Sequence, residues 1–392
     1  MAEMLEGIRI LDLSRLLPGP FCTQMLGDLG AEVIKIEEVQ GGDYARWMPP
    51  KGKADSGMFQ ALNRNKKSMK LDLRSPAGRE IFLKLVETAD VVVEQFRPGV
   101  LDKLGVGYEA IRAVNPRIIM CAITGYGQDG PYKDLAGHDI NYLNVAGISD
   151  TTGIYRGKPV SSGVQIADVG GGSLWAAFSI LGAIIGREKT GRGQYIDVSM
   201  TDCAFTLTTM LAGAYNYDKR LPSRGEWMLN GACAWYNFYK TSDERWIGIG
   251  MLEEKFWATF CKAIGREDFI KRQFGPRNVQ EEIASELDAV FATKTADEWM
   301  EFLGPLDVCA NKVNNLAEAM TDPHLLARGM IIDIEHPVDG KIKNLAFPVK
   351  FSDTPYSVKT PPPAFGQHTE EILKQLGYSA SDMEELKKNG TI

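Results

Sequence analysis

Short apolar runs alternate with helix-like stretches through the first half of the chain. Runs rich in valine, isoleucine and leucine predict strands, whereas apolar positions three or four residues apart predict helices. The runs that predict strands are Ile8–Leu13, Val33–Ile36, Ser68–Leu73, Val91–Val93, Ile118–Ile123 and, later, Gln194–Ser199. Strands that alternate with helices predict an α/β fold, with a parallel sheet covered by helices on both faces.

Turn and capping residues mark the helices between these strands. Pro18-Gly19-Pro20 precedes a helical stretch from Phe21 to Leu29, and Gly30 is placed to end it. Ser75-Pro76 is typical of a helix start, with serine as the N-cap and proline at the first helical position. Ser173–Arg187 is apolar nearly all round and predicts a buried helix.

The pattern changes after about residue 205. Residues 225–243 are rich in aromatic side chains and show little helical periodicity. Helical patterns follow at Glu253–Ile264 and Thr295–Leu303, and Thr295 with Glu298 has the spacing of a capping box. We predict a smaller second domain over residues 225–320.

The tail returns to shorter, strand-like pieces. Gly329–Ile334 and Ala346–Phe351 each read as a strand, and Thr369–Leu376 reads as a last helix. A proline-rich stretch at 361–363 separates the second strand from this helix.

Composition narrows the class of protein. Of the 392 residues 44% are hydrophobic and 24% are charged, which is typical of a globular protein with a sizeable core. The net charge of -7 argues against general nucleic-acid binding, which needs a broad positive surface. An anionic ligand must therefore meet a local cluster of cations.

Cysteines and apolar runs indicate the compartment. The six cysteines are scattered, with no Cys-x-x-Cys pair and no metal-ligand spacing, so we expect reduced thiols and no metal site. The N-terminus carries charges where a signal peptide has its apolar run. The most apolar stretch, Ser173–Ile185, has 13 residues, too few to span a bilayer. We expect a cytoplasmic enzyme that does not act on a membrane.

The segment Arg64-Asn65-Lys66-Lys67 concentrates positive charge in an acidic protein. It is either a solvated charged loop or a clamp for phosphate groups. Arg97 directly follows a predicted strand, the place where open α/β sheets bind ligands. The first strand–helix turn, Leu17–Pro20, lacks G-x-G-x-x-G, so we expect no NAD.

Asp168 lies between an apolar segment and the predicted buried helix, and is followed by Gly170, Gly171 and Gly172. An aspartate there either caps the helix or serves chemistry. In the second case the glycines let a ligand approach the backbone, and the helix N-terminus keeps the carboxylate ionised. The residues alone leave both interpretations open.

His138 and Glu253 have the same two interpretations. A loop histidine is often only a hydrogen-bonded side chain, but the segment Gly137–Tyr142 surrounds His138 with glycine and polar groups. Glu253 and Glu254 open a predicted helix, where acids commonly interact with the helix dipole.

At these residues the chain resembles the class III CoA-transferases, a family that includes the alpha-methylacyl-CoA racemases. The matching segments are Leu5–Leu13, Pro18–Pro20, Gly30–Glu37, Arg64–Leu73, Arg97–Gly99, Gly125–Gln128, Ala167-Asp168, Gly191–Gln194 and Gly366–Glu370. The resemblance therefore covers nearly the whole chain.

The resemblance implies a large Rossmann-like domain built from both chain ends, residues 1–205 and 325–392, with the small α+β domain between them. It implies an interlocked homodimer. It also implies a coenzyme A site, for which no other cofactor is expected. The residues expected to bind coenzyme A are Arg64, Lys66, Lys67, Arg97, Tyr142 and Gly170.

The resemblance implies two alternative reactions. In transferases, the aspartate that matches Asp168 attacks the thioester, and CoA passes to a carboxylate acceptor. In racemases, the residues that match His138 and Asp168 exchange the α-proton of a 2-methylacyl-CoA, and the match to Glu253 pairs with the histidine. The form of Gly137–Tyr142 favours the racemase, whereas Val164 replaces the usual racemase asparagine.

A non-catalytic CoA-binding module is a third alternative, and a nicotinamide dehydrogenase is a weaker one because the glycine fingerprint is missing.

Overall fold

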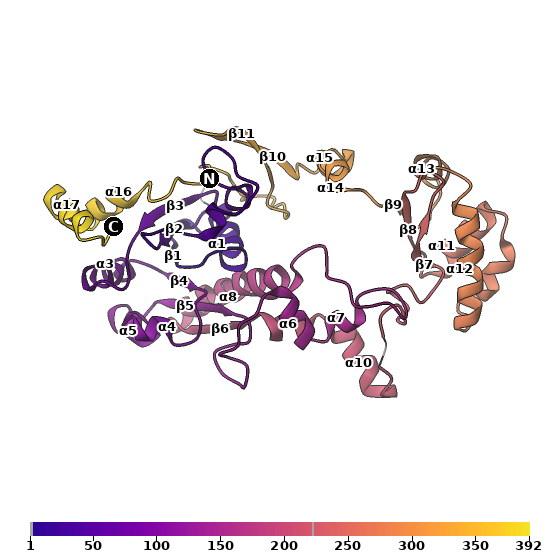
Figure 1. Ribbon diagram of the computed structural model, residues 1–392, viewed down its shortest axis with the longest axis horizontal. Helices are drawn as coiled ribbons and strands as arrows, with labels where there is room; N and C mark the ends of the chain where they lie inside the picture. The colour runs from indigo at the N-terminus through magenta and orange to yellow at the C-terminus, as the bar shows by residue number, and fades with distance from the viewer. Residues whose placement is uncertain (1–2, 222) are drawn as a thin grey trace. The chain divides into compact units, whose positions relative to one another are not determined.

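The computed structural model contains a six-stranded parallel sheet with the strand order β3-β2-β1-β4-β5-β6 (Figure 1). Its strands are β1 (Arg9–Asp12), β2 (Glu32–Glu37), β3 (Lys66–Lys70), β4 (Val91–Glu94), β5 (Ile119–Thr124) and β6 (Tyr195–Ser199). The predicted parallel sheet is confirmed. The order reverses direction between β1 and β4, which makes the carboxyl ends of these strands a topological switch point.

The chain forms two compact units. The first comprises Met1–Ala146, Val164–Leu207 and Leu326–Ile392, and the second comprises Gly147–Gly163 and Thr208–Leu325. The structure describes residues 3–221 and 223–392, so residues 1 and 2 of the predicted range 1–205 lie outside it. The predicted range 225–320 does not include 147–163, which belong to the second unit.

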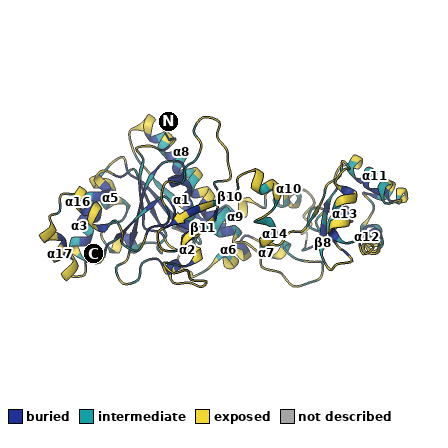
Figure 2. Ribbon diagram, turned by 90° about the horizontal axis from the view of Figure 1, so that it is seen from above, coloured by how far each residue is buried: buried dark blue, intermediate teal, exposed yellow. Residues whose placement is uncertain are grey.

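Helices pack on both faces of the sheet. The helices of the first unit are α1 (Pro18–Asp28), α2 (Gly57–Leu62), α3 (Pro76–Glu87), α4 (Val100–Lys103), α5 (Tyr108–Val114), α6 (Asp139–Val145), α8 (Trp175–Thr190), α9 (Met200–Thr206), α16 (Thr369–Gln375) and α17 (Ala380–Lys388). α1 and α8 contact one face, and α3, α5, α16 and α17 share an apolar core with the other. β4 and β5 are buried along their whole length; in Figure 2 buried residues are dark blue and gather inside the first unit.

Local signals place the ends of several helices. The Ser75 side chain accepts a hydrogen bond from the Gly78 N–H at 2.9 Å, with Pro76 at the first helical position of α3. Gly30 follows α1 with a φ of +107°, which other residues rarely adopt. The predicted N-cap and C-terminal glycine are therefore both present.

The apolar helix begins earlier than the sequence predicts. A π-helix, Ile166–Leu174, leads directly into α8. Within the described part of the chain, Ile166–Thr190 is the one helix that is long and apolar enough to cross a membrane, judged by its 25 residues and its composition. Core helices of soluble proteins also satisfy this criterion.

α8 is only partly buried. Ala176 and Ile180 are fully buried, as the prediction requires, but Phe178 and Ile185 are 69% and 63% exposed. The residues that the structure describes therefore leave an apolar face of this helix uncovered.

The C-terminal hairpin corrects one predicted strand. β10 (Ile331–His336) pairs with β11 (Gly340–Leu345), whereas Ala346–Phe351 forms no strand. Pro348 lacks the backbone N–H that a strand in this position needs to continue its pairing.

The second unit is built on a small antiparallel sheet of order β7-β8-β9. Its elements are α7 (Ile148–Thr151), α10 (Thr209–Asp218), β7 (Tyr236–Lys240), β8 (Trp246–Gly250), α11 (Glu254–Ala263), α12 (Arg277–Phe291), α13 (Ala296–Leu303), β9 (Ala310–Lys312), α14 (Leu316–Ala319) and α15 (Pro323–Ala327), the last of which extends into the first unit. The predicted capping box of Thr295 and Glu298 starts α13.

The cysteines are unpaired. Cys22, Cys121 and Cys261 are buried, Cys203 and Cys233 are half-buried, and Cys309 is exposed.

Candidate active site

A cavity of about 500 Å³ opens where β1, β4 and β5 end, at the topological switch point of the sheet. Four of the predicted site residues line it together: Arg97, His138, Tyr142 and Asp168. Arg97 comes from the loop after β4, and the other three come from segments that follow β5 in the chain. The sheet therefore gathers residues far apart in sequence, as expected for an α/β ligand site.

Asp168 lies in the first turn of the π-helix Ile166–Leu174. The prediction of a helix start is confirmed, although the helix is of the π type. Such segments are rare and occur frequently at functional sites. Of the three glycines, Gly171 and Gly172 serve packing, since a Cβ at Gly171 would lie 2.7 Å from the Met200 carbonyl oxygen.

Asp139 occupies the N–H groups that the sequence assigns to a ligand or to Asp168. Its Oδ1 accepts hydrogen bonds from the backbone N–H groups of Ala167, at 2.7 Å, and Asp168, at 3.0 Å. Because Asp139 is the neighbour of His138, these bonds also fix the start of α6 against the start of the π-helix. The relative placement of His138 and Asp168 thus depends on Asp139.

The environment of Asp168 raises its pKa to about 6, because of burial first and the nearby Asp139 carboxylate second, while His138 opposes the rise. Burial and Asp139 therefore outweigh the expected effect of the helix N-terminus, whose N–H groups bond to Asp139. At pH 7 the carboxylate is still mostly ionised. An acid with a pKa this close to neutrality can both accept and return a proton.

His138 is exposed to the cavity at the N-cap of α6, and its backbone N–H bonds to Asn141 Oδ1 at 3.1 Å. Tyr142, one turn later, holds this helix in place. Its hydroxyl donates to the Gly137 carbonyl at 2.5 Å. Its ring packs so closely on Gly125 that a Cβ there would lie 2.2 Å from it. Tyr142 therefore positions the histidine segment as well as lining the cavity.

The burial of Arg64 and Lys66 contradicts the prediction that they bind the phosphate groups of a ligand. Arg64 is buried against Asp28, with Nη2 2.6 Å from Oδ2, and it also bonds to Asn344 Oδ1 at 3.1 Å. Lys66 Nζ is buried 3.1 Å from Asp12 Oδ2, and burial lowers its pKa to about 8. Both side chains have exchanged water for internal partners, so neither presents a donor to a ligand.

The remaining predicted residues lie outside this cavity. Lys67, on β3, is half-buried and pairs with Glu32 at 3.1 Å and Glu371 at 2.9 Å. Gly170 lies in the π-helix but does not line the cavity. Glu253 belongs to the second unit, where it is the exposed N-cap residue of α11.

Two cations of the cavity were missed at the sequence level. Arg15 follows β1 and Lys133 lies in the loop before α6, and both line the cavity beside Arg97. Among the described residues these three side chains form no ion pair. The signal for Arg15 was its position, since it follows β1 at the switch point just as Arg97 follows β4.

Comparison with known proteins gives consistent matches along the whole chain. Residues 5–369 match the model of the family described as CoA-transferase family III. The chain is 37% identical to an acyl-CoA transferase of Fusarium pseudograminearum, over 99% of this chain and 88% of that protein. It is 32% identical to the alpha-methylacyl-CoA racemase of Homo sapiens, over 99% and 97%. A crystal structure of a CAIB/BAIF family protein from Brucella suis has a TM-score of 0.85 at 32% identity, covering 96% of this chain and 100% of that one.

Proposed function

This chain belongs to CoA-transferase family III, and from that premise we propose that it racemises a 2-methyl-branched acyl-CoA thioester. The observation that carries the proposal is that Asp168 and His138 line the same cavity. The pKa of Asp168, raised to about 6, supports it. One of these groups removes the α-proton, which leaves an enolate, and the other returns a proton to the opposite face.

The environment of Asp168 suits this role. A base is most effective when its pKa lies near the working pH, and an ordinary carboxyl group, with a pKa near 3.8, is a weak base at pH 7. Burial beside Asp139 moves Asp168 toward the useful range. The coenzyme A part of the substrate carries phosphate groups, which bind to positive charge. The cations Arg97, Arg15 and Lys133, which line the cavity, supply that charge.

Single-enantiomer substrate tests the proposal. Wild type should convert (2R)-2-methylacyl-CoA to a mixture of both enantiomers. Asp168→Asn and His138→Gln should each lower the rate by roughly 10²- to 10⁴-fold, the range for loss of a general acid–base group. A wild-type enzyme that leaves the enantiomer unchanged across a panel of branched acyl-CoAs would overturn the racemase assignment.

The family resemblance implies that Glu253 is the partner of His138, and the proposal includes it in that role. We expect Glu253→Gln to slow racemisation. Its neighbour Glu254, also exposed in the same helix start, provides a matched control. Equal rates for Glu253→Gln and Glu254→Gln would remove Glu253 from the mechanism.

CoA transfer is the second candidate function, favoured by Val164 and by the acyl-CoA transferase that is 37% identical to this chain. Asp168 attacks the thioester carbonyl and CoA thiolate leaves, which gives a mixed anhydride. The thiolate then attacks the Asp168 carbonyl, which releases the donor acid and leaves an enzyme-bound thioester. An acceptor carboxylate then attacks the carbonyl of this thioester and displaces CoA thiolate, which gives a second mixed anhydride. The thiolate attacks the acceptor's acyl carbon of this anhydride, which forms the new acyl-CoA and releases the Asp168 carboxylate.

Trapping separates the two candidates. Hydroxylamine added during turnover converts an Asp168 anhydride or thioester to a hydroxamate, which peptide mass spectrometry detects. A modified Asp168 together with transfer of CoA to carboxylates would favour the transferase. An unmodified Asp168 alongside racemisation would favour proton transfer.

We also propose that the enzyme is a cytoplasmic homodimer. The support is the uncovered apolar face of α8, where Phe178 and Ile185 are exposed. A second copy would bury such a face, and exposed apolar patches commonly mark association sites. Light scattering should give twice the mass of one chain, and Phe178→Asp should lower it. A wild-type monomer, or a chain that sediments with membranes, would contradict this proposal.

A further inference from the structure

Arg15 is an exposed cation that lines the cavity containing Asp168. Its guanidinium lies over the ring of Tyr44, 4.4 Å from the centroid, and 6.0 Å from that of Phe96. All three side chains line the cavity. Within the described chain the Arg15 side chain forms no ion pair or hydrogen bond, so its N–H donors remain available.

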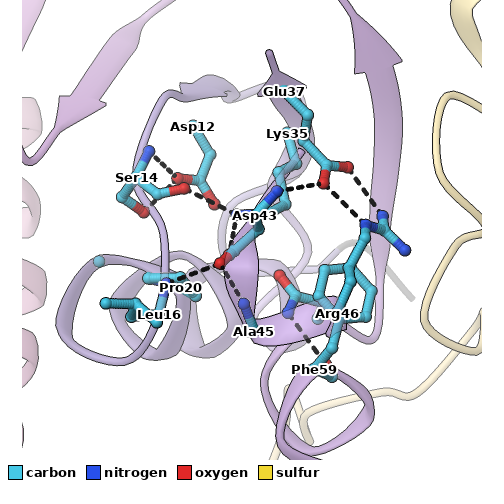
Figure 3. Close-up of polar contacts among 12 residues, drawn as sticks. Asp12, Ser14, Leu16, Pro20, Lys35, Glu37, Asp43, Ala45, Arg46 and Phe59 are labelled. Atoms are coloured by element: carbon cyan, nitrogen blue, oxygen red, sulfur yellow. Dashed lines mark hydrogen bonds and ion pairs between the residues drawn. The ribbon is translucent and has the colours of Figure 1, made fainter. Parts of the chain in front are cut away.

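Buried groups fix the backbone on both sides of Arg15 (Figure 3). Before it, the Ser14 carbonyl accepts a hydrogen bond from Lys35 Nζ at 2.7 Å. After it, Leu16 has a φ of +63°, a left-handed conformation that is unfavourable for leucine. The Leu16 N–H donates to Asp43 Oδ1 at 3.0 Å, which holds it in that conformation.

The groups that hold this loop form a buried ion-pair network. Lys35 Nζ lies 3.0 Å from Asp43 Oδ2, and both side chains are almost completely excluded from water. Asp12, also fully buried, accepts from the Ser14 N–H at 2.9 Å. Burying charges costs more than an apolar core would, so such a network is better explained by the geometry that it imposes.

Asp43 and Tyr44 hold the main chain and the side chain of Arg15 in place. Asp43 fixes the main chain through Leu16, and Tyr44, its neighbour in sequence, supports the guanidinium from one side. Arg15 and Tyr44 both line the cavity. Backbone and side chain are therefore set before a ligand arrives, which reduces the entropy that binding would otherwise cost.

We propose that Arg15 binds an anionic group of the substrate, a phosphate or a carboxylate, and that Asp43 and Tyr44 position it. A guanidinium suits this role because it forms paired hydrogen bonds to either oxyanion. The inference rests on the proposed function, which brings an acyl-CoA to this cavity. Two groups carry such an oxyanion: the phosphates of coenzyme A, and a carboxylate on the acyl or acceptor molecule.

Calorimetric binding of CoA, 3′-dephospho-CoA and succinate to the full-length enzyme tests Arg15. We expect Arg15→Gln to weaken one of these ligands by roughly 10- to 100-fold, the loss of a charged hydrogen-bonding partner. Arg15→Lys should recover part of the loss. Arg112→Gln removes an exposed arginine of α5, outside this cavity, and should change nothing.

The three ligands distinguish the sources. Equal weakening of CoA and dephospho-CoA assigns Arg15 to the pyrophosphate, and weakening of CoA alone assigns it to the 3′-phosphate. Weakening of succinate alone assigns it to a carboxylate. Unchanged affinity for all three overturns the inference. A wild-type enzyme that binds no CoA would instead count against the proposed function.

The positioning role has its own readout. Tyr44→Leu removes the support of the guanidinium without touching Asp168, so it should raise KM and leave kcat unchanged. Asp43→Asn removes the carboxylate that forms the ion pair with buried Lys35, so the folding of this variant is checked first by circular dichroism. If Asp43→Asn does not fold, Tyr44→Leu carries the test. A Tyr44→Leu enzyme with wild-type KM would remove the positioning claim.

Discussion

At the scale of single residues, like charges and burial set the chemistry of the site. Asp139 holds the start of the π-helix through two backbone N–H groups and raises the pKa of Asp168 by its negative charge. These two effects can be separated, because an asparagine keeps the accepting oxygen and loses the charge.

Asp139→Asn should move the acid limb of the pH–rate profile. In wild type the rate should rise with pH through about 6, as Asp168 ionises. Without the neighbouring charge the pKa of Asp168 falls, so the limb should shift to lower pH. Asp134→Asn, an exposed aspartate of the preceding loop, is the control. An unchanged limb in Asp139→Asn would show that Asp139 does not set the pKa of Asp168.

Glu94 gives a prediction on stability. Burial raises the pKa of this carboxyl group from 4.5 to about 8, and Asp102 and Asp197 add to the rise. The folded state therefore holds a proton that the unfolded state loses above about pH 4.5, so the stability due to Glu94 falls as pH rises toward 8.

Glu94→Gln should remove this dependence. Its amide oxygen still accepts the Phe96 N–H, which Glu94 Oε2 accepts at 2.7 Å in the wild type. We expect the melting temperature of the variant to fall less between pH 5 and pH 8 than that of the wild type. Glu109→Gln, at an exposed position, should behave like wild type. If the melting temperatures of Glu94→Gln and wild type change with pH in parallel, that result contradicts the raised pKa of Glu94.

At the scale of elements, glycines determine how the π-helix packs. Gly171 lets the Met200 backbone of α9 approach, and an alanine Cβ there would lie 2.7 Å from the Met200 carbonyl oxygen. Gly171→Ala should cost about 1–3 kcal/mol in the free energy of unfolding, as overpacking does. It should also slow catalysis, because the π-helix carries Asp168.

Gly213→Ala is the matched control, since nothing lies within 4 Å of a Cβ there and the residue is inside α10. It should stabilise by about 0.5–1 kcal/mol, the helix propensity of alanine over glycine. Urea unfolding measures both variants. If Gly171→Ala is as stable as Gly213→Ala, the Met200 backbone does not pack tightly against residue 171.

Sequence patterns predicted elements better than they predicted partners. The six strands of the parallel sheet and the caps of α3 and α13 follow from local runs and local capping residues. α12 was missed although Ile283, Leu287 and Phe291, which are buried, have the four-residue spacing of one helix face.

Ion-pair partners depend on tertiary structure. Arg64 pairs with Asp28, 36 residues away, and Lys66 pairs with Asp12, 54 residues away. No count of charges in a segment reveals whether a distant carboxylate will reach it. Arg97 was found because its position after a strand is a topological signal, which does not depend on such a partner.

At the scale of the whole molecule, both ends of the chain build the first unit. α16 and α17, at the C-terminus, lie beside β3 and α3 (Figure 1) and complete the core on that face of the sheet. A change in the last residues should therefore destabilise a sheet made of the first 200.

Leu373→Ala tests this dependence. Leu373 is completely buried in that core, so its truncation should cost about 2–5 kcal/mol in the free energy of unfolding. Lys374→Ala, at the next and exposed position, should stay within about 0.5 kcal/mol of wild type. Equal unfolding curves would mean that the C-terminal helices are dispensable for the fold.

The central claim is that Asp168 and His138 act as two bases on opposite faces of one α-carbon, and deuterium exchange tests it most directly. Each enantiomer of a 2-methylacyl-CoA is incubated in D2O with wild type, Asp168→Asn or His138→Gln, and the α-deuterium is measured by mass spectrometry. We predict exchange from both enantiomers with wild type, and from opposite single enantiomers with the two variants. No α-deuterium from either enantiomer with wild type would contradict the account.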